Sequence, residues 1–245
     1  MTYGLVSDIH ANLTALEAVL DRLRGVDRFV CPGDVVGYGP DPAECLSRVR
    51  SLDCVTVLGN HDAAVCGMMN PSWFNPDARE AISWTHQALG EADLHALSIL
   101  PLTHEANQFV VVHGSLAGPE EFPYILSPGE ARRCFEEMGD HGVCFVGHSH
   151  VSEIYVQQPG VFGVDQIGMP SGGKLDLRPG LRYIVNCGSV GQPRDGNPDA
   201  SCAVFDSEAM AVEIIRVPYD FPAVQDRMRR AGLPQFLIDR LEFGA

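Results

Sequence analysis

The chain has 245 residues, of which 45% are hydrophobic, and its formal net charge is −15 with neutral histidines. This length allows one large domain with a buried core, and no apolar run reaches the ~20 residues that a membrane-spanning helix needs. The charge argues against long nucleic acids as partners, because binding to them depends on Lys and Arg that neutralise phosphates. A phosphorylated substrate would need a local reversal of sign, which bound metal can provide.

The first hundred residues alternate between strand and helix patterns. The strand-like runs are 3–8, 27–34 and 53–62, and the amphipathic helical patterns between them are 13–23 and 41–52. This alternation predicts an α/β core with a mostly parallel sheet. Residues 76–100 have a helical pattern without any motif, so we expect them to cap one end of the core.

The rest of the chain is richer in strands. The expected strands are 108–114, 142–150, 153–158, 182–191, 201–206 and 211–217, and the expected helices are 222–232 and 234–244. Residues 159–180 are rich in Gly and Pro, which predicts a hairpin or loop excursion. We find no linker composition, so we expect a single domain over 1–245, with two sheets packed face to face and helices outside.

The cysteines bear on the cellular compartment. All eight lie well apart without a C-x-x-C pair, and several fall within apolar runs. This pattern favours reduced, partly buried thiols over a disulfide framework or a zinc site. The first residues also lack the basic and long apolar stretches of a signal peptide. We therefore expect a cytoplasmic protein.

Polar residues follow five of the expected strands, and they are of the kinds that bind metal. These positions are Asp8 and His10, Gly33 and Asp34, Gly59 to Asp62, His113 and Gly114, and Gly147 to His150. Ligands of α/β sheets bind beyond the carboxyl ends of strands. Strand alternation would place His148 and His150 on one face. Mixed oxygen and nitrogen donors suit Mn, Fe or Zn better than Ca or Mg.

Each of these features has an ordinary structural explanation when it is taken alone. An Asp at a strand end is commonly a turn former or helix cap, and "GNHD" has the composition of a plain turn. A lone histidine such as His113 is more often a core or surface residue. Five such coincidences in sequence order favour a single shared site.

The motifs that carry these residues resemble those of the calcineurin-like metallophosphoesterases. The matching segments are "SDIHAN", "PGDVVGYGPDP", "LGNHD", "VVHGS" and "VGHSH", and the later "NCGSVGQPRDG" resembles a segment of the small bacterial branch. The resemblance implies a metallophosphoesterase-like α/β fold, a two-sheet β-sandwich core flanked by helices in four αββα layers. Cys187 departs from the pattern, since many relatives have proline there.

The resemblance also implies a pair of metal ions. Asp8, His10 and His150 would hold the first, Asn60, His113 and His148 the second, and Asp34 would bridge them. The expected cofactors are two divalent transition metals, Mn²⁺ in preference to Fe, Zn, Ni or Co. Two carboxylates and one bridging hydroxide would leave about one net positive charge to attract a phosphate ester, and the metals would supply that hydroxide near neutral pH.

Four further residues are candidates for substrate binding or catalysis. His61 is left over from the ligand set and is predicted to donate a proton to the leaving oxygen or a hydrogen bond to the developing charge. Asp62 either orients His61 or caps a following helix. Asn12 either supports substrate binding or, as we favour, caps residues 13–23. Arg194 in "GSVGQPRDG" either clamps a phosphate oxygen or forms a surface salt bridge.

The predicted function is metal-dependent hydrolysis of a phosphomonoester or phosphodiester of a small molecule or nucleotide. Dinucleoside polyphosphate hydrolase and protein serine/threonine phosphatase are the alternatives, and a non-catalytic metal-binding scaffold is disfavoured because no motif position is degraded. A pocket for a nucleobase or aryl group could be lined by Tyr38, Trp73 and Trp84, although aromatic residues more often pack in the core. We expect the protein to act on a small phosphorylated molecule and to bind neither long nucleic acids nor membranes. Whether it forms a homo-oligomer is left open.

Overall fold

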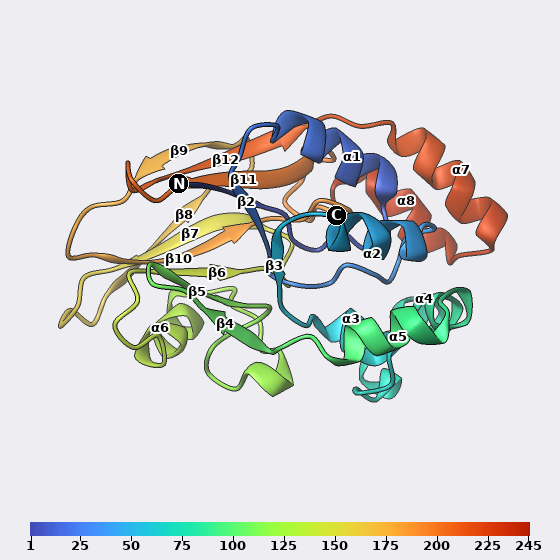
Figure 1. Cartoon of the computed structure of the whole chain (residues 1–245), viewed down its shortest axis with the longest axis horizontal. Helices are drawn as coiled ribbons and strands as arrows, with labels where there is room; N and C mark the ends of the chain where they lie inside the picture. The colour runs from blue at the N-terminus through green and yellow to red at the C-terminus, as the bar shows by residue number, and fades with distance from the viewer.

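The computed structural model describes residues 1–245 and contains two six-stranded sheets (Figure 1). Sheet A consists, in spatial order, of β3 (Cys54–Thr56), β2 (Arg28–Cys31), β1 (Thr2–Leu5), β11 (Ala200–Asp206), β12 (Ala211–Val217) and β9 (Gly173–Asp176). Sheet B consists of β4 (Thr103–Glu105), β5 (Phe109–Val112), β6 (Val143–Val146), β10 (Arg182–Cys187), β7 (Ser152–Gln157) and β8 (Val164–Gly168).

Both sheets are mixed, so the expectation of a mostly parallel sheet is wrong. Parallel pairing is limited to β1–β2–β3 in sheet A and β5–β6–β10 in sheet B. The other neighbouring strands run antiparallel. The physical reason is that strands β7 to β12 follow one another without crossover helices, which parallel neighbours would require.

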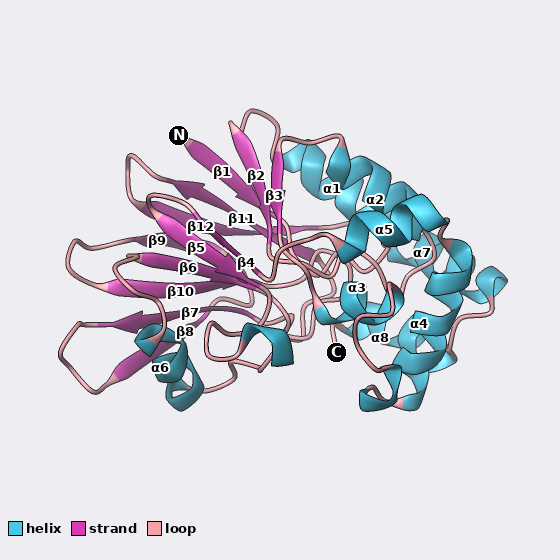
Figure 2. Ribbon diagram, turned by 60° about the horizontal axis from the view of Figure 1, so that its bottom comes forward, coloured by secondary structure: helices cyan, strands magenta, loops and turns pink.

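Eight α-helices complete the fold. They are α1 (Leu13–Arg22), α2 (Pro42–Arg50), α3 (Asn60–Val65), α4 (Pro76–Ala88), α5 (Glu91–Ser98), α6 (Pro128–Glu136), α7 (Phe221–Ala231) and α8 (Gln235–Phe243). Helices α1 and α2 pack on the outer face of sheet A, and α6 packs on the outer face of sheet B. The predicted core of two packed sheets between helices is confirmed. Figure 2 shows most helices gathered at one end of the sheets.

The core between the sheets follows from alternation of side chains along the strands. Phe145 on β6 lies between Phe109 of its own sheet and Phe205 of sheet A, with ring centroids 5.1 and 5.3 Å away. The neighbouring Val110 and Cys144 face α6 instead. Strands β5 and β6 are therefore buried on both faces, which explains their uninterrupted apolar runs.

Of the two arrangements expected for residues 159–180, the structure has the excursion and not the hairpin, because β8 pairs with β7 in sheet B while β9 pairs with β12 in sheet A. This excursion therefore links the two sheets at their edges. The "GNHD" segment is not a simple turn, since α3 begins at Asn60 directly after Gly59. The helical expectation for residues 76–100 is confirmed by α4 and α5.

The eight cysteines are all free thiols, as the sequence predicted, and six of them are buried. The structure contains no helix with the length and apolar character needed to cross a bilayer.

A buried ion pair connects the two sheets beside the loop that follows β10. Arg216 on β12 pairs with Asp195 in that loop, and only 7% and 3% of these side chains are exposed. Arg216 also donates to the hydroxyl of Ser152 on β7 at 2.9 Å, and Asp195 accepts from the Ser152 amide at 3.1 Å. The pair therefore holds the loop against strands of both sheets.

Replacing Arg216 by Gln should destabilise the protein strongly, because the charge of Asp195 would stay buried without its partner. We expect the free energy of unfolding, measured by urea denaturation, to fall by about 3–5 kcal/mol. The matched control is Arg24→Gln, whose pair with Asp21 is exposed, and about 0–1 kcal/mol is expected there. Equal losses in the two variants would contradict the structural role of the buried pair.

Candidate metal centre

The candidate ligands lie in loops beyond β1, β2, β5 and β6 and at the start of α3, and several have an unusual backbone. Asp8, His10, Asp34, His148 and His150 all have positive φ, between 48° and 68°. Residues with side chains avoid this left-handed region, and such strain concentrates at functional sites. This backbone corrects one expectation: β6 ends at Val146, so a left-handed loop, not strand alternation, places His148 and His150.

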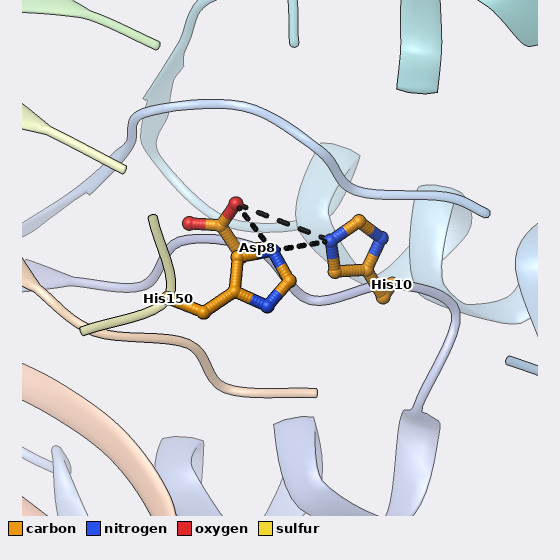
Figure 3. Close-up of side chains that lie close together, drawn as sticks. All are labelled: Asp8, His10 and His150. Atoms are coloured by element: carbon orange, nitrogen blue, oxygen red, sulfur yellow. Dashed lines mark hydrogen bonds and ion pairs between the residues drawn. The ribbon is translucent and has the colours of Figure 1, made fainter. Parts of the chain in front are cut away.

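The first cluster consists of Asp8, His10 and His150 (Figure 3). The Nε2 atoms of His10 and His150 lie 3.0 Å apart. Oδ1 of Asp8 is 3.3 Å from Nε2 of His150 and 4.0 Å from Nε2 of His10. All three side chains are buried. Three ligand atoms from two loops therefore face one point.

The second cluster consists of Asp34, His113 and His148. Nε2 of His113 lies 3.3 Å from Oδ2 of Asp34 and 3.0 Å from Oδ1 of Asn60. Asn60 reaches this cluster from the first position of α3. The structure thus brings together all seven residues that the sequence predicted as ligands.

Asp34 lies between the two clusters. Its Oδ2 atom is 3.6 Å from Nε2 of His10 and 3.3 Å from Nε2 of His113. Its Oδ1 atom accepts a hydrogen bond from the backbone amide of His61 at 2.8 Å, which fixes the carboxylate. One oxygen is therefore directed at both clusters, as a bridging ligand requires. Bridging itself stays a prediction.

Main-chain carbonyl groups orient three of the four imidazoles. Nδ1 of His10 lies 3.2 Å from the oxygen of Val36, Nδ1 of His113 lies 2.8 Å from that of Pro32, and Nδ1 of His150 lies 2.6 Å from that of Gln192. A carbonyl oxygen can only accept, so Nδ1 carries the proton in each ring. The Nε2 lone pairs therefore point to the centre, as in metal-bound histidines.

This donor set fits a bound metal ion. Two Nε2 atoms with lone pairs facing each other at 3.0 Å repel unless a cation lies between them. Ligands about 2.1 Å from one metal, at right angles to each other, lie about 3 Å apart. Nε2 of His113 and the oxygen of Asn60 are also 3.0 Å apart, which matches the spacing of two ligands of one metal. Both clusters therefore have the chemistry and spacing of a metal shell.

Burial affects the charge of these groups. It lowers the pKa of His10, His148 and His150, so these rings are neutral and able to bind metal. Burial also acts to lower the pKa of His113, but the adjacent carboxylate of Asp34 outweighs it and raises that pKa to about 9. Metal that binds at His113 must therefore displace a proton.

Two glycines allow the loops to approach the carboxylates. A Cβ atom at Gly59 would overlap the carboxylate of Asp34, and one at Gly147 would overlap that of Asp8 and the hydroxyl of Ser7. Ser7 donates to Oδ2 of Asp8 at 2.6 Å. The glycines of "GNHD" and "GHSH" are thus needed for close approach of neighbouring loops.

The comparisons with known proteins agree with this geometry. Residues 1–210 match the model of the calcineurin-like phosphoesterase superfamily domain. The chain belongs to this superfamily. It is similar to the crystal structure of a metallophosphoesterase from Sphaerobacter thermophilus, with 42% identity, a TM-score of 0.90, and coverage of 100% of this chain and 99% of that one.

Two curated relatives extend the comparison. An uncharacterized protein of Methanocaldococcus jannaschii is 37% identical over 98% of this chain and 97% of its own length. A symmetrical bis(5′-nucleosyl)-tetraphosphatase of Vibrio vulnificus is 25% identical over 88% of this chain and 77% of its own. Membership of this metallophosphoesterase superfamily makes the chain a phosphoester hydrolase that depends on divalent metal.

His61 and Asp62 have separate environments in this phosphoesterase. The His61 ring lines a cleft beside the clusters, and its buried Nδ1 atom has no hydrogen-bond partner. Burial, opposed by Asp34, lowers the pKa of His61 to about 4. The Asp62 carboxylate instead accepts from the amides of Val35 and Val36 at 3.2 and 3.0 Å. Asp62 therefore anchors the loop that carries Asp34, and the prediction that it orients His61 is wrong.

The alternative prediction for Asp62, a helix cap, also needs correction. Gly59 is the N-cap of α3, and Asp62 occupies the third position of the helix, where its carboxylate accepts from the Gly59 amide at 3.3 Å. Asn12 is the N-cap of α1, accepting from the Ala15 amide at 3.1 Å, as we favoured. Its amide group donates to the oxygen of Gly191 at 3.0 Å, and the side chain is buried.

The cleft beside the clusters has a volume of about 340 Å³. Arg194 lines it, and the predicted alternative of a salt bridge fails because Asp195 pairs with Arg216. Tyr38 and Trp73 also line the cleft, whereas Trp84 does not.

Tyr124 and Arg240 are among the residues of the cleft wall that sequence reasoning missed. Tyr124 stacks on the His148 ring with centroids 3.7 Å apart. Arg240 belongs to α8, near the end of the chain. No motif marked either residue, because Tyr124 lies in an irregular loop and Arg240 occupies an ordinary charged position of an amphipathic helix.

Replacing Asp34 by Asn should lower occupancy of both metal positions, because one of the two carboxylates near the centre is lost. Elemental analysis of protein loaded with Mn²⁺ should give clearly less than the two equivalents expected of the parent protein. Asp21→Asn, a change at an exposed side chain, is the control and should retain both. Two full equivalents in Asp34→Asn would rule out the bridging assignment.

Proposed function

We propose that this phosphoesterase hydrolyses esters of a small phosphorylated molecule or nucleotide, using two divalent ions held by the clusters around Asp34. The position of Asp34 carries the proposal, because its Oδ2 atom faces His10 at 3.6 Å and His113 at 3.3 Å. Asp8, His10 and His150 would hold one ion, and Asn60, His113 and His148 the other.

Manganese is the metal we propose, with Fe, Zn, Ni and Co as alternatives. The donor set of imidazoles, carboxylates and one amide supports a transition metal over Ca or Mg, which favour oxygen-only shells. When bound, two such ions supply a hydroxide nucleophile near neutral pH and neutralise developing charge on the phosphoryl oxygens.

The charges of the bound ions and of their ligands together set the sign of the charge that a phosphate meets. Asp8 and Asp34 are the carboxylates of the two clusters, whereas metal-bound imidazoles and Asn60 add no charge. A third carboxylate in place of Asn60 would nearly cancel the attraction for phosphate. With two bound dications and one bridging hydroxide, the site would therefore carry about one net positive charge, although the whole chain carries −15.

His61 is placed to act on the leaving group. Its ring stands beside the first cluster, with its centroid 4.9 Å from that of His10, and it borders the cleft. A neutral imidazole has one N–H donor, and the ring packs against Tyr38 and Phe74 at centroid distances of 4.2 and 4.9 Å, which limit its rotation. We assign it hydrogen-bond or proton donation to the leaving oxygen.

The cleft supports a small substrate with an aromatic group. Tyr38, Trp73, Phe74 and Tyr124 line it, and 72% of Trp73 is exposed. Aromatic rings of this kind stack with nucleobases. The Vibrio relative is named a bis(5′-nucleosyl)-tetraphosphatase, so dinucleoside polyphosphate hydrolysis is the second candidate. Protein serine/threonine phosphatase stays an alternative without an observation in its favour.

The proposed partners and compartment are those of a small-molecule enzyme. The net charge of −15 supports exclusion of long nucleic acids. Eight free thiols support a reducing compartment such as the cytoplasm.

The proposal is tested by hydrolysis of bis-p-nitrophenyl phosphate and p-nitrophenyl phosphate in the presence of Mn²⁺, Ni²⁺, Mg²⁺ or a chelator. We expect metal-dependent release of p-nitrophenol from one or both esters, abolished by chelator and restored by Mn²⁺. The ratio of the two rates assigns the ester class. Absence of turnover with every metal would contradict the proposed function.

Replacing His61 by Gln should reduce kcat while both metals are retained. The loss should reach about 10²–10⁴-fold for an alkyl ester, whose alkoxide is a poor leaving group. It should be smaller for a p-nitrophenyl ester, because that leaving group needs little protonation. Steady-state kinetics with both esters measure the difference, and His95→Gln on the exposed side of α5 is the control. Equal losses for the two esters would argue against donation to the leaving oxygen.

Arg194→Ala should reduce kcat/KM by about 10- to 150-fold if its guanidinium binds the phosphoryl group or a neighbouring phosphate. Lysine at this position keeps the charge but loses the planar fork, so Arg194→Lys should recover part of the loss. The measurement is made at saturating metal. A decrease in kcat/KM of less than about threefold, well short of that range, would rule out phosphate binding by Arg194.

A further inference from the structure

Two arginines line the same cleft from different parts of the chain. Arg194 comes from the loop after β10, and Arg240 comes from α8. Neither arginine forms an ion pair with an Asp or Glu side chain, although the chain has 32 acidic residues against 17 basic ones, and Arg240 contacts the oxygen of Ala245. The one acidic residue of the cleft wall is Glu121, which is exposed. The two guanidinium groups thus have no acidic side chain as a partner.

The hydrogen bonds of both guanidinium groups leave donors free. Arg194 donates to Oε1 of Gln192 at 3.1 Å and to the hydroxyl of Tyr38 at 3.4 Å, while its buried Nε atom has no partner. Arg240 donates through Nε to the main-chain oxygen of Ala245, and neither of its terminal nitrogens makes a hydrogen bond within the protein. Several N–H groups at this wall can therefore bind an anion.

Neighbouring loops hold the two arginines in place. The backbone amide of Arg194 donates to the oxygen of His150 at 3.1 Å, which joins Arg194 to the first metal cluster. The amide of Gly196 donates to the oxygen of Gly244 at 2.9 Å, which ties the same loop to the end of α8. The wall with Arg240 is therefore connected to the candidate centre through one short loop.

Electrostatics agree with this placement. Burial, and next the positive charge of Arg194, lower the pKa of Arg240 to about 10. The positive charge of Arg194 thus disfavours the charged form of Arg240. Such repulsion is relieved when an anion binds between them.

We propose that Arg194 and Arg240 form a second anion site beside the metal centre, which takes a phosphate joined to the one attacked. The substrate class is then an ester with two or more linked phosphates, and Arg240 distinguishes it from a simple phosphate ester. This inference rests on the proposed function for the position of the attacked phosphate.

The test is direct binding, so it does not depend on turnover. Methylenediphosphonate and methylphosphonate are titrated calorimetrically into Mn²⁺-loaded protein at buffered free Mn²⁺, with the heat of metal chelation subtracted. Arg240→Gln should weaken the binding of methylenediphosphonate by about 10- to 100-fold, which is the effect of losing one charge-assisted contact. The loss for methylphosphonate should be at least fivefold smaller. Arg240→Lys should recover part of the affinity, because it keeps the charge.

The matched control is Arg230→Gln, which removes the same charge from an exposed position on α7, outside the cleft. It should leave both affinities unchanged, and thermal unfolding should show that all variants are folded. Equal losses for the two phosphonates in Arg240→Gln, or no loss for either, would overturn the second site. So would an equal loss in Arg230→Gln. Failure of the proposed function appears separately, as absence of p-nitrophenol release with every metal.

Discussion

Three hydrogen bonds from imidazole Nδ1 atoms to main-chain oxygens determine what this site can do. They fix the tautomers of His10, His113 and His150 and direct Nε2 of each ring to the centre. The accepting oxygens belong to Val36, Pro32 and Gln192, residues of loops that themselves carry or adjoin other candidate ligands. Each loop therefore orients its neighbour's ligand, and the centre depends on all of them together.

The surrounding fold offsets the free energy that this backbone conformation costs. Five candidate ligands have left-handed backbone, and each such residue costs of order 1–3 kcal/mol. The loops are held in this form by sheets that are buried on both faces. Two further contacts hold them: Asp62 accepts from the amides of Val35 and Val36, and Asp195 forms a buried pair with Arg216. The rigid core therefore preorganises ligands that would otherwise relax apart.

The clustering of the candidate ligands was predictable because strand ends carry them in a strict order, and the helices were predictable because their apolar spacing is regular. Other features depend on tertiary contacts that no local pattern encodes. The sequence shows an acid beside His61, but only the fold turns Asp62 toward a different loop. Arg240 is a routine surface charge by its spacing, yet packing of α8 brings it to the cleft. Strands β8 and β9 likewise join different sheets because of pairing distant in sequence.

The central claim is that two metal ions share Asp34. Crystals grown with Mn²⁺ and measured at the manganese absorption edge test it most directly, since anomalous scattering locates each ion independently of the ligand assignment. The account predicts two peaks, one bonded by Asp8, His10 and His150 and the other by Asn60, His113 and His148, with the Asp34 carboxylate in contact with both. A single peak at full metal loading, or a second ion bonded by other side chains, would contradict it.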